Sequence, residues 1–73
     1  MNTTTYEDDH LMIELMRPVT LYAESAEQAP QYFNQGTLLR VLMRAPHVLL
    51  VENDQHLGFK VSLSDENRIW HEF

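Results

Sequence analysis

The chain has 73 residues, 44% of them apolar, and it contains no cysteine. A chain of this length builds one small core, and without cysteine neither a disulfide nor a thiolate-held zinc ion adds to its stability. Eleven acidic against five basic residues give a net charge of −6, which disfavours nucleic acid and anionic membranes as direct partners.

We expect a single domain over residues 1–73, with residues 1–5 disordered because they show no periodicity. No charged-then-apolar signal opens the chain and no apolar run approaches the ~18 residues that span a bilayer, so a cytoplasmic location is predicted. Six acidic residues and one arginine give residues 1–39 a net charge of −5, whereas residues 40–73 carry −1. The acidic half favours a partner with a basic surface, although acidic residues also keep a small protein soluble.

Residues 6–17 are predicted to form a helix. Thr5 is a suitable N-cap, acidic residues follow it, and Pro18 ends the run. Apolar pairs at i,i+4 spacing give this helix one apolar face. A strand is the alternative, because the segment from Leu11 to Leu15 also alternates with a period of two.

The next segment combines a strand with a helix. Val19–Ala23 is rich in β-prone residues and predicts a strand. Ser25 and Gln28 match a capping box, so a helix is expected from Ala26 to Phe33, distorted by Pro30.

A second helix is expected over Leu38–Ala45, capped by Thr37 and ended by Pro46. Gly36 suits the left-handed end of the preceding helix. Two helices joined by a short glycine-containing turn also fit a helix-turn-helix, but the acidic chain and the presence of only two arginines in the second helix weigh against it.

After Pro46 the spacing of the apolar residues changes from that of a helix to that of strands. His47–Glu52 and Leu57–Leu63 are predicted to be strands joined by a turn at Asn53–His56. Val48–Val51 is apolar on both faces, which is typical of a central strand covered on both sides. Arg68–Phe73 is predicted to be a third strand or a short helix.

These elements predict an α+β fold, with two or three short helices packed on a small antiparallel sheet made of a C-terminal hairpin or a three-stranded meander.

The sequence carries no motif for catalysis. The four histidines lack the i,i+3 or i,i+4 spacing of metal ligands on a helix, and the two glycines cannot form a phosphate-binding loop. Adjacent carboxylates point in different directions and make poor acid–base couples. We therefore expect no catalytic residues, no metal and no cofactor, and a protein that is not an enzyme.

Three candidate binding elements remain. An acidic patch beside an aromatic ring would dock on the basic surface of a partner. Arg68 and Trp70 have the chemistry of an interface anchor, and core packing is the alternative for the tryptophan. Leu49 and Val51 would form an exposed apolar patch if no helix covers their face of the sheet. The acidic patch consists of Tyr6, Glu7, Asp8 and Asp9.

In size, acidity and absence of catalytic signatures, the whole chain resembles the small bacteriophage proteins that bind the host RNA polymerase and redirect transcription. The resemblance rests on no motif, so no functional residue is carried over from it. It implies a compact regulator that occupies a surface of the polymerase in the host cytoplasm and inhibits initiation or alters termination.

Two other functions fit the same composition. An acidic mimic of nucleic acid would inhibit a nuclease or a restriction system, and would need carboxylates spaced like phosphates over much of its surface. An antitoxin or dimerisation module would use the apolar strand Val48–Val51 to form a homodimer.

Overall fold

The computed structural model describes residues 11–73, which form seven β-strands and one turn of 3-10 helix. The predicted α+β class is therefore wrong, because the described chain is an antiparallel β-sheet without an α-helix. The elements are β1 (Met12–Leu15), β2 (Val19–Ala23), β3 (Gln31–Phe33), β4 (Leu38–Arg44), β5 (Val48–Glu52), β6 (Gly58–Ser62), η2 (Leu63–Asp65) and β7 (Trp70–Glu72).

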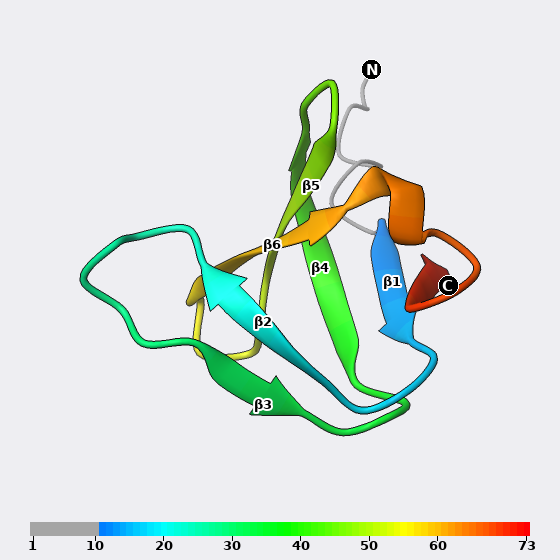
Figure 1. Cartoon of the computed structure of the whole chain (residues 1–73), viewed down its shortest axis with the longest axis horizontal. Helices are drawn as coiled ribbons and strands as arrows, with labels where there is room; N and C mark the ends of the chain where they lie inside the picture. Colours follow the sequence, from blue (N-terminus) through cyan, green and yellow to red (C-terminus); the bar gives the residue numbers. More distant parts are fainter. Residues whose placement is uncertain (1–10) are drawn as a thin grey trace, which may run out of the picture.

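The seven strands form one sheet in the order β3-β2-β6-β5-β4-β1-β7, and each neighbouring pair is antiparallel. Figure 1 shows β6 crossing between the pair β2–β3 and the strands β5, β4 and β1, so the sheet curls over its own inner face. A strongly twisted sheet buries one face in this way without help from a helix.

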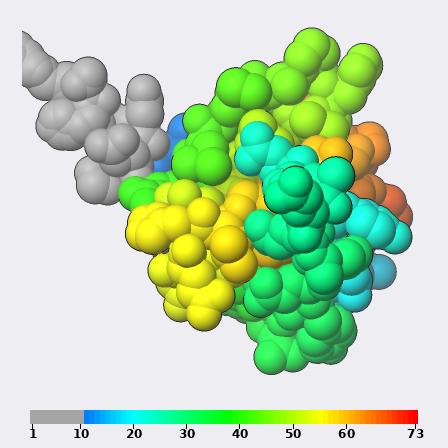
Figure 2. All heavy atoms as spheres, turned by 90° about the vertical axis from the view of Figure 1, so that its left-hand side faces the viewer, coloured from blue at the N-terminus to red at the C-terminus, as the bar shows by residue number. Residues whose placement is uncertain are grey.

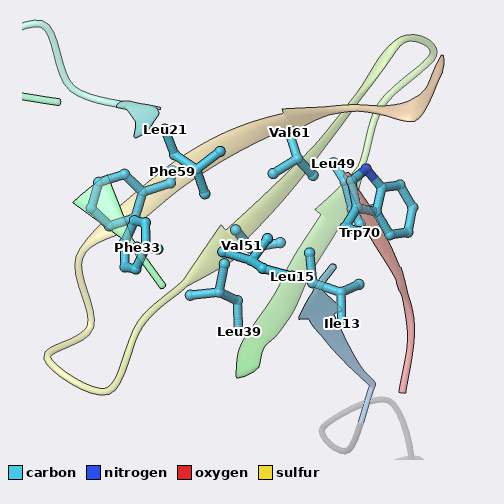
Figure 3. Packing of buried hydrophobic residues seen from close by; sticks show 10 residues of the cluster. All are labelled: Ile13, Leu15, Leu21, Phe33, Leu39, Leu49, Val51, Phe59, Val61 and Trp70. Atoms are coloured by element: carbon cyan, nitrogen blue, oxygen red, sulfur yellow. The ribbon is translucent and has the colours of Figure 1, made fainter. Parts of the chain in front are cut away.

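The inner face supplies the whole core. Every strand contributes at least one buried side chain, and the ring of Phe33 meets that of Phe59 edge to face at 5.1 Å. Figure 3 shows these side chains gathered in one cluster between the strands. The core consists of Ile13, Leu15, Leu21, Phe33, Leu39, Leu49, Val51, Phe59, Val61 and Trp70.

The helix predicted over residues 6–17 is replaced, in its described part, by β1. Ile13 and Leu15 are fully buried and face the core, while Met12 and Glu14 face outward. The alternative prediction of a strand was correct, because the period of two matches the pairing of β1 with β4 and β7.

The helix predicted over Leu38–Ala45 is the strand β4. Its register on β5 pairs Val41 with Val51 and Met43 with Leu50, so Leu42 is an extra residue that forms a β-bulge. The bulge interrupts the alternation of the strand, and the apolar residues on either side of it then fit a helical period as well as a strand. Pairing with two neighbouring strands decides the conformation.

The helix predicted over Ala26–Phe33 is a turn followed by β3. The amide of Glu27 donates to the Ser25 hydroxyl at 3.2 Å, so the expected capping residue stabilises a turn instead. Pro30 then precedes the edge strand β3, where a missing N–H is tolerated.

Gly36 has the predicted left-handed conformation, with φ of +88°, but it lies in the turn between β3 and β4. Thr37 closes this turn rather than capping a helix, because its hydroxyl donates to the carbonyl of Asn34 at 2.7 Å.

The strands predicted over His47–Glu52 and Leu57–Leu63 are confirmed as the hairpin β5–β6, and Arg68–Phe73 takes the strand alternative as β7. The predicted three-stranded meander is wrong, because β7 pairs with β1 and not with β6. β5 lies between β6 and β4, as expected for a central strand. Among the described residues, no helix covers its outer face, so Leu50 is half-buried there. No helix in residues 11–73 is long and apolar enough to cross a membrane.

Candidate protein-binding site

The residues predicted to form the acidic patch, Tyr6, Glu7, Asp8 and Asp9, lie outside the described residues. The other predicted binding residues do not form a common surface. Trp70, Leu49 and Val51 are at most 1% exposed and belong to the core, so the structure presents none of them to a partner. The core alternative for Trp70 is what the structure shows.

Arg68 is exposed, but it does not lie beside an exposed tryptophan. Its guanidinium donates to the Asp65 carboxylate at 2.6 Å, three residues earlier in the same turn. The predicted anchor of an arginine and a tryptophan is therefore divided between the surface and the core.

A groove opens where β2 and β6 separate. The two strands pair only at Tyr22 with Lys60 and at Ala23 with Phe59, although both strands continue beyond these pairs. The groove has a volume of about 510 Å³ and a mainly apolar floor. We call it the β2–β6 groove; it is lined by Val19, Thr20, Leu21, Tyr22, Val48, Lys60, Val61, Ser62, Asp65 and Ile69.

Two exposed tyrosines lie on the outer face of β2 and β3, and Tyr22 is the one that lines this groove. Tyr22, at the rim, is 68% exposed, and Tyr32 on the adjacent strand β3 is 60% exposed. Both face outward, because Leu21 and Phe33 beside them in sequence face the core. Tyr32 pairs with Thr20, two residues from Tyr22, so the two rings are diagonal neighbours on one face of the sheet.

The loop that follows β2 adds negative charge to this face. Within the described chain, Glu24 and Glu27 form no ion pair, and neither do Asp54 and Glu66 elsewhere. An arginine or a histidine lies within 4 Å of each of the remaining described acids, Glu14, Glu52, Asp65 and Glu72. The side chain of Glu24 lies over Gly58, where an added Cβ would stand 2.8 Å from its Oε1.

This loop and the loop between β5 and β6 lie side by side on the face shown in Figure 2. Lys60, opposite Tyr22, is the one basic residue that lines the groove among the described residues.

A second depression lies on the outer face around Glu52, with a volume of about 400 Å³. The guanidinium of Arg40 donates to Glu52 through Nε at 2.9 Å, and His56 Nδ1 lies 3.5 Å from the same carboxylate. The Glu52 side chain is only 11% exposed, so these contacts satisfy a charge that would otherwise be largely desolvated and unpaired. In residues 11–73, no three His, Cys, Asp or Glu side chains form a group that could hold a metal ion. This depression is therefore best explained by a structural ion pair.

The exposure of Tyr22 could have been predicted from the sequence, although Tyr22 was not among the predicted binding residues. The strand Val19–Ala23 was predicted, and its alternation places Tyr22 opposite to Leu21, on the outer face. Tyr32 gave no such signal, because it fell within a predicted helix. The groove itself depends on where two distant strands separate, which the local pattern does not contain.

No known protein family, no characterised protein and no solved structure compared with the chain matches it.

Proposed function

We propose that the chain is a non-enzymatic regulator that binds a large host enzyme, RNA polymerase, and thereby inhibits the initiation of transcription or alters its termination. It would act in the cytoplasm of a bacterial host and need no cofactor. The observation that carries the binding role is Tyr22, 68% exposed at the rim of the apolar β2–β6 groove, with the exposed Tyr32 as its diagonal neighbour on β3. The bulk resemblance to small bacteriophage regulators is what favours the polymerase as the partner.

Exposed tyrosines next to an apolar groove have the chemistry of an interface hot spot. A tyrosine supplies a large rigid contact area at a low cost in side-chain entropy, and hot-spot residues cluster around desolvated pockets. An apolar side chain of the partner would enter the groove, where the Tyr22 ring would shield it from water, and Tyr32 would extend the contact onto β3.

The net charge of −6 selects a basic surface for this contact. Glu24 and Glu27 stand in the loop beyond Tyr22 without ion-pair partners in the described chain, so they are available to arginine or lysine side chains of the partner. The acidic stretch Glu7–Asp9 would add to the long-range attraction, which acts mainly on the association rate and weakens with salt.

Affinity capture from a lysate of the bacterial host, with identification by mass spectrometry, tests this proposal. The tagged chain is expected to recover the subunits of RNA polymerase, and the Tyr22→Ala variant is expected to recover much less. Leu38→Ala is the matched control, because Leu38 is also exposed but lies on β4 outside the groove. Recovery of a nuclease instead of polymerase subunits would contradict the proposal.

The captured complex should then be rebuilt from purified parts. Addition of the chain to purified polymerase is expected to reduce promoter-dependent transcripts or to change the position at which they end. Transcription that is unchanged at concentrations that saturate binding would contradict the regulatory role, while leaving the binding itself established.

A further inference from the structure

A second apolar hollow lies at the opposite end of the sheet, where β1 begins and β4 ends. Its floor contains Ile13 and Leu49, which are 0% and 1% exposed, and its volume is about 200 Å³. Three exposed apolar side chains stand at its rim. These are Leu11, Leu42 and Met43, which are 44%, 50% and 53% exposed. We call this surface the β4 hollow.

The bulge in β4 places an exposed leucine at the rim of this hollow. Leu42 is the extra residue between the paired positions Val41 and Met43, and a bulge turns its extra side chain away from the regular alternation. An exposed leucine and an apolar hollow thus lie next to each other on the same face. A surface that contains both a projection and a recess can be complementary to a copy of itself, as a two-fold symmetric interface requires.

The charges at the β4 hollow are balanced. Arg44 and Glu72 are the only charged residues that line it in the described chain, and their side chains are 56% and 55% exposed. They lie 3.7 Å apart, a loose contact between two solvated groups. Two copies of a chain with a net charge of −6 repel each other in general, so a neutral face with one charge of each sign is where two copies approach at the lowest electrostatic cost.

We propose that the β4 hollow binds a second copy of this chain in a two-fold symmetric dimer. Leu42 of each copy enters the hollow of the other, and Arg44 of each copy faces Glu72 of the other. The β4 hollow and the β2–β6 groove are lined by different residues. Failure of the dimer proposal would therefore leave the proposed binding of a partner protein untouched, and the reverse also holds.

Sedimentation equilibrium of the full chain over a range of micromolar concentrations measures the dimer directly. The unmodified chain is expected to show a reversible monomer–dimer equilibrium. Leu42→Asp buries a charge in the interface and is expected to weaken dimerisation by about tenfold or more. Leu38→Asp, the same change at an exposed leucine of β4 outside the hollow, is the control that leaves the equilibrium unchanged. Circular dichroism verifies that each variant keeps its strands.

Charge reversal distinguishes this dimer from any other. Arg44→Glu alone sets two carboxylates against each other across the interface, and Glu72→Arg alone sets two guanidinium groups against each other, so each variant is expected to be monomeric. A mixture of the two variants is expected to form a mixed dimer, since unlike charges then face each other across the interface.

An unmodified chain that stays monomeric at several hundred micromolar would overturn the proposal. So would a dimer that is insensitive to Leu42→Asp, or two reversed variants that do not associate when mixed.

Discussion

The indole Nε1 of Trp70 donates a hydrogen bond of 2.9 Å to the carbonyl oxygen of Ser62, the last residue of β6. Earlier in the same strand, the carbonyl of Gly58 accepts from the amide of Glu24, the residue that follows β2. Carbonyl groups at alternate positions of a strand point to the same side, so the Ser62 carbonyl also points towards β2. Trp70 thus satisfies an acceptor at the end of β6 where the pairing with β2 has stopped, and the β2–β6 groove opens there.

Trp70→Phe is expected to lower the free energy of unfolding by about 1–3 kcal/mol, because it keeps most of the apolar contact but leaves the part-buried Ser62 carbonyl without its donor. Urea denaturation followed by circular dichroism measures the change. Trp70→Ala is the reference, and it is expected to cost about 3–5 kcal/mol because it also leaves a cavity. Equal stability of the phenylalanine variant and the unmodified chain would show that the hydrogen bond contributes nothing.

The two glycines of the chain are expected to respond differently to the same change. At Gly36 an added Cβ meets nothing within 4 Å, but φ is +88°, so Gly36→Ala is expected to cost about 1–2 kcal/mol through backbone strain. At Gly58 the nearest atom to an added Cβ is the carboxylate end of Glu24, which can move aside. Gly58→Ala is therefore expected to change stability by less than about 1 kcal/mol. Thermal denaturation of both variants tests the contrast, and the reverse order would refute it.

Asn53 is a buried polar residue that shapes the turn between β5 and β6. Its Oδ1 accepts from the amides of Gln55 and Leu57 at 2.9 and 3.0 Å. Asn53→Ala is expected to destabilise the fold by about 1–3 kcal/mol, since two backbone donors lose their acceptor. Asn53→Asp keeps both acceptor bonds and is expected to recover most of this loss in the same urea titration. Equal losses in the two variants would mean that the turn does not depend on this oxygen.

The two ion pairs Arg40–Glu52 and Arg68–Asp65 are expected to contribute differently to the free energy of unfolding, because they differ in burial. Arg40→Ala removes two donors from Glu52, a side chain that is only 11% exposed, and is expected to cost about 1.5–3 kcal/mol. Arg68→Ala breaks the local pair with Asp65, but the arginine is 66% exposed, so the cost is expected to stay below about 1 kcal/mol. Chemical denaturation of both variants decides the point, and a larger loss for Arg68→Ala would contradict it.

The sequence pattern predicted the strands of the second half of the chain better than those of the first half. β6 alternates between buried Phe59 and Val61 and outward-facing Gly58, Lys60 and Ser62, so the order of its residues alone predicts a period of two. The sequence of β4 does not show a regular period of two, because the bulge at Leu42 shifts the alternation of inward and outward side chains halfway along the strand. A bulge depends on the partner strand, and a local pattern does not contain it.

The candidate site was less predictable than the fold for a related reason. Leu49 and Val51 were expected to be exposed unless a helix covered them, yet their face is the one that the curled sheet encloses. The curl brings β2 and β3 over the opposite strands, and nothing in the local sequence of β5 indicates which of its two apolar faces will be enclosed. Tyr22 and Tyr32 come together through the pairing of β2 with β3, which replaced a predicted helix.

We propose that Tyr22 and the β2–β6 groove bind RNA polymerase. Isothermal titration of purified bacterial host polymerase with the unmodified chain and with Tyr22→Ala tests it most directly, with Leu38→Ala as the control. The unmodified chain and the control are expected to bind at micromolar concentration or below, and Tyr22→Ala about tenfold or more weakly. No binding by the unmodified chain, or equal affinities of the unmodified chain and Tyr22→Ala, would contradict the claim.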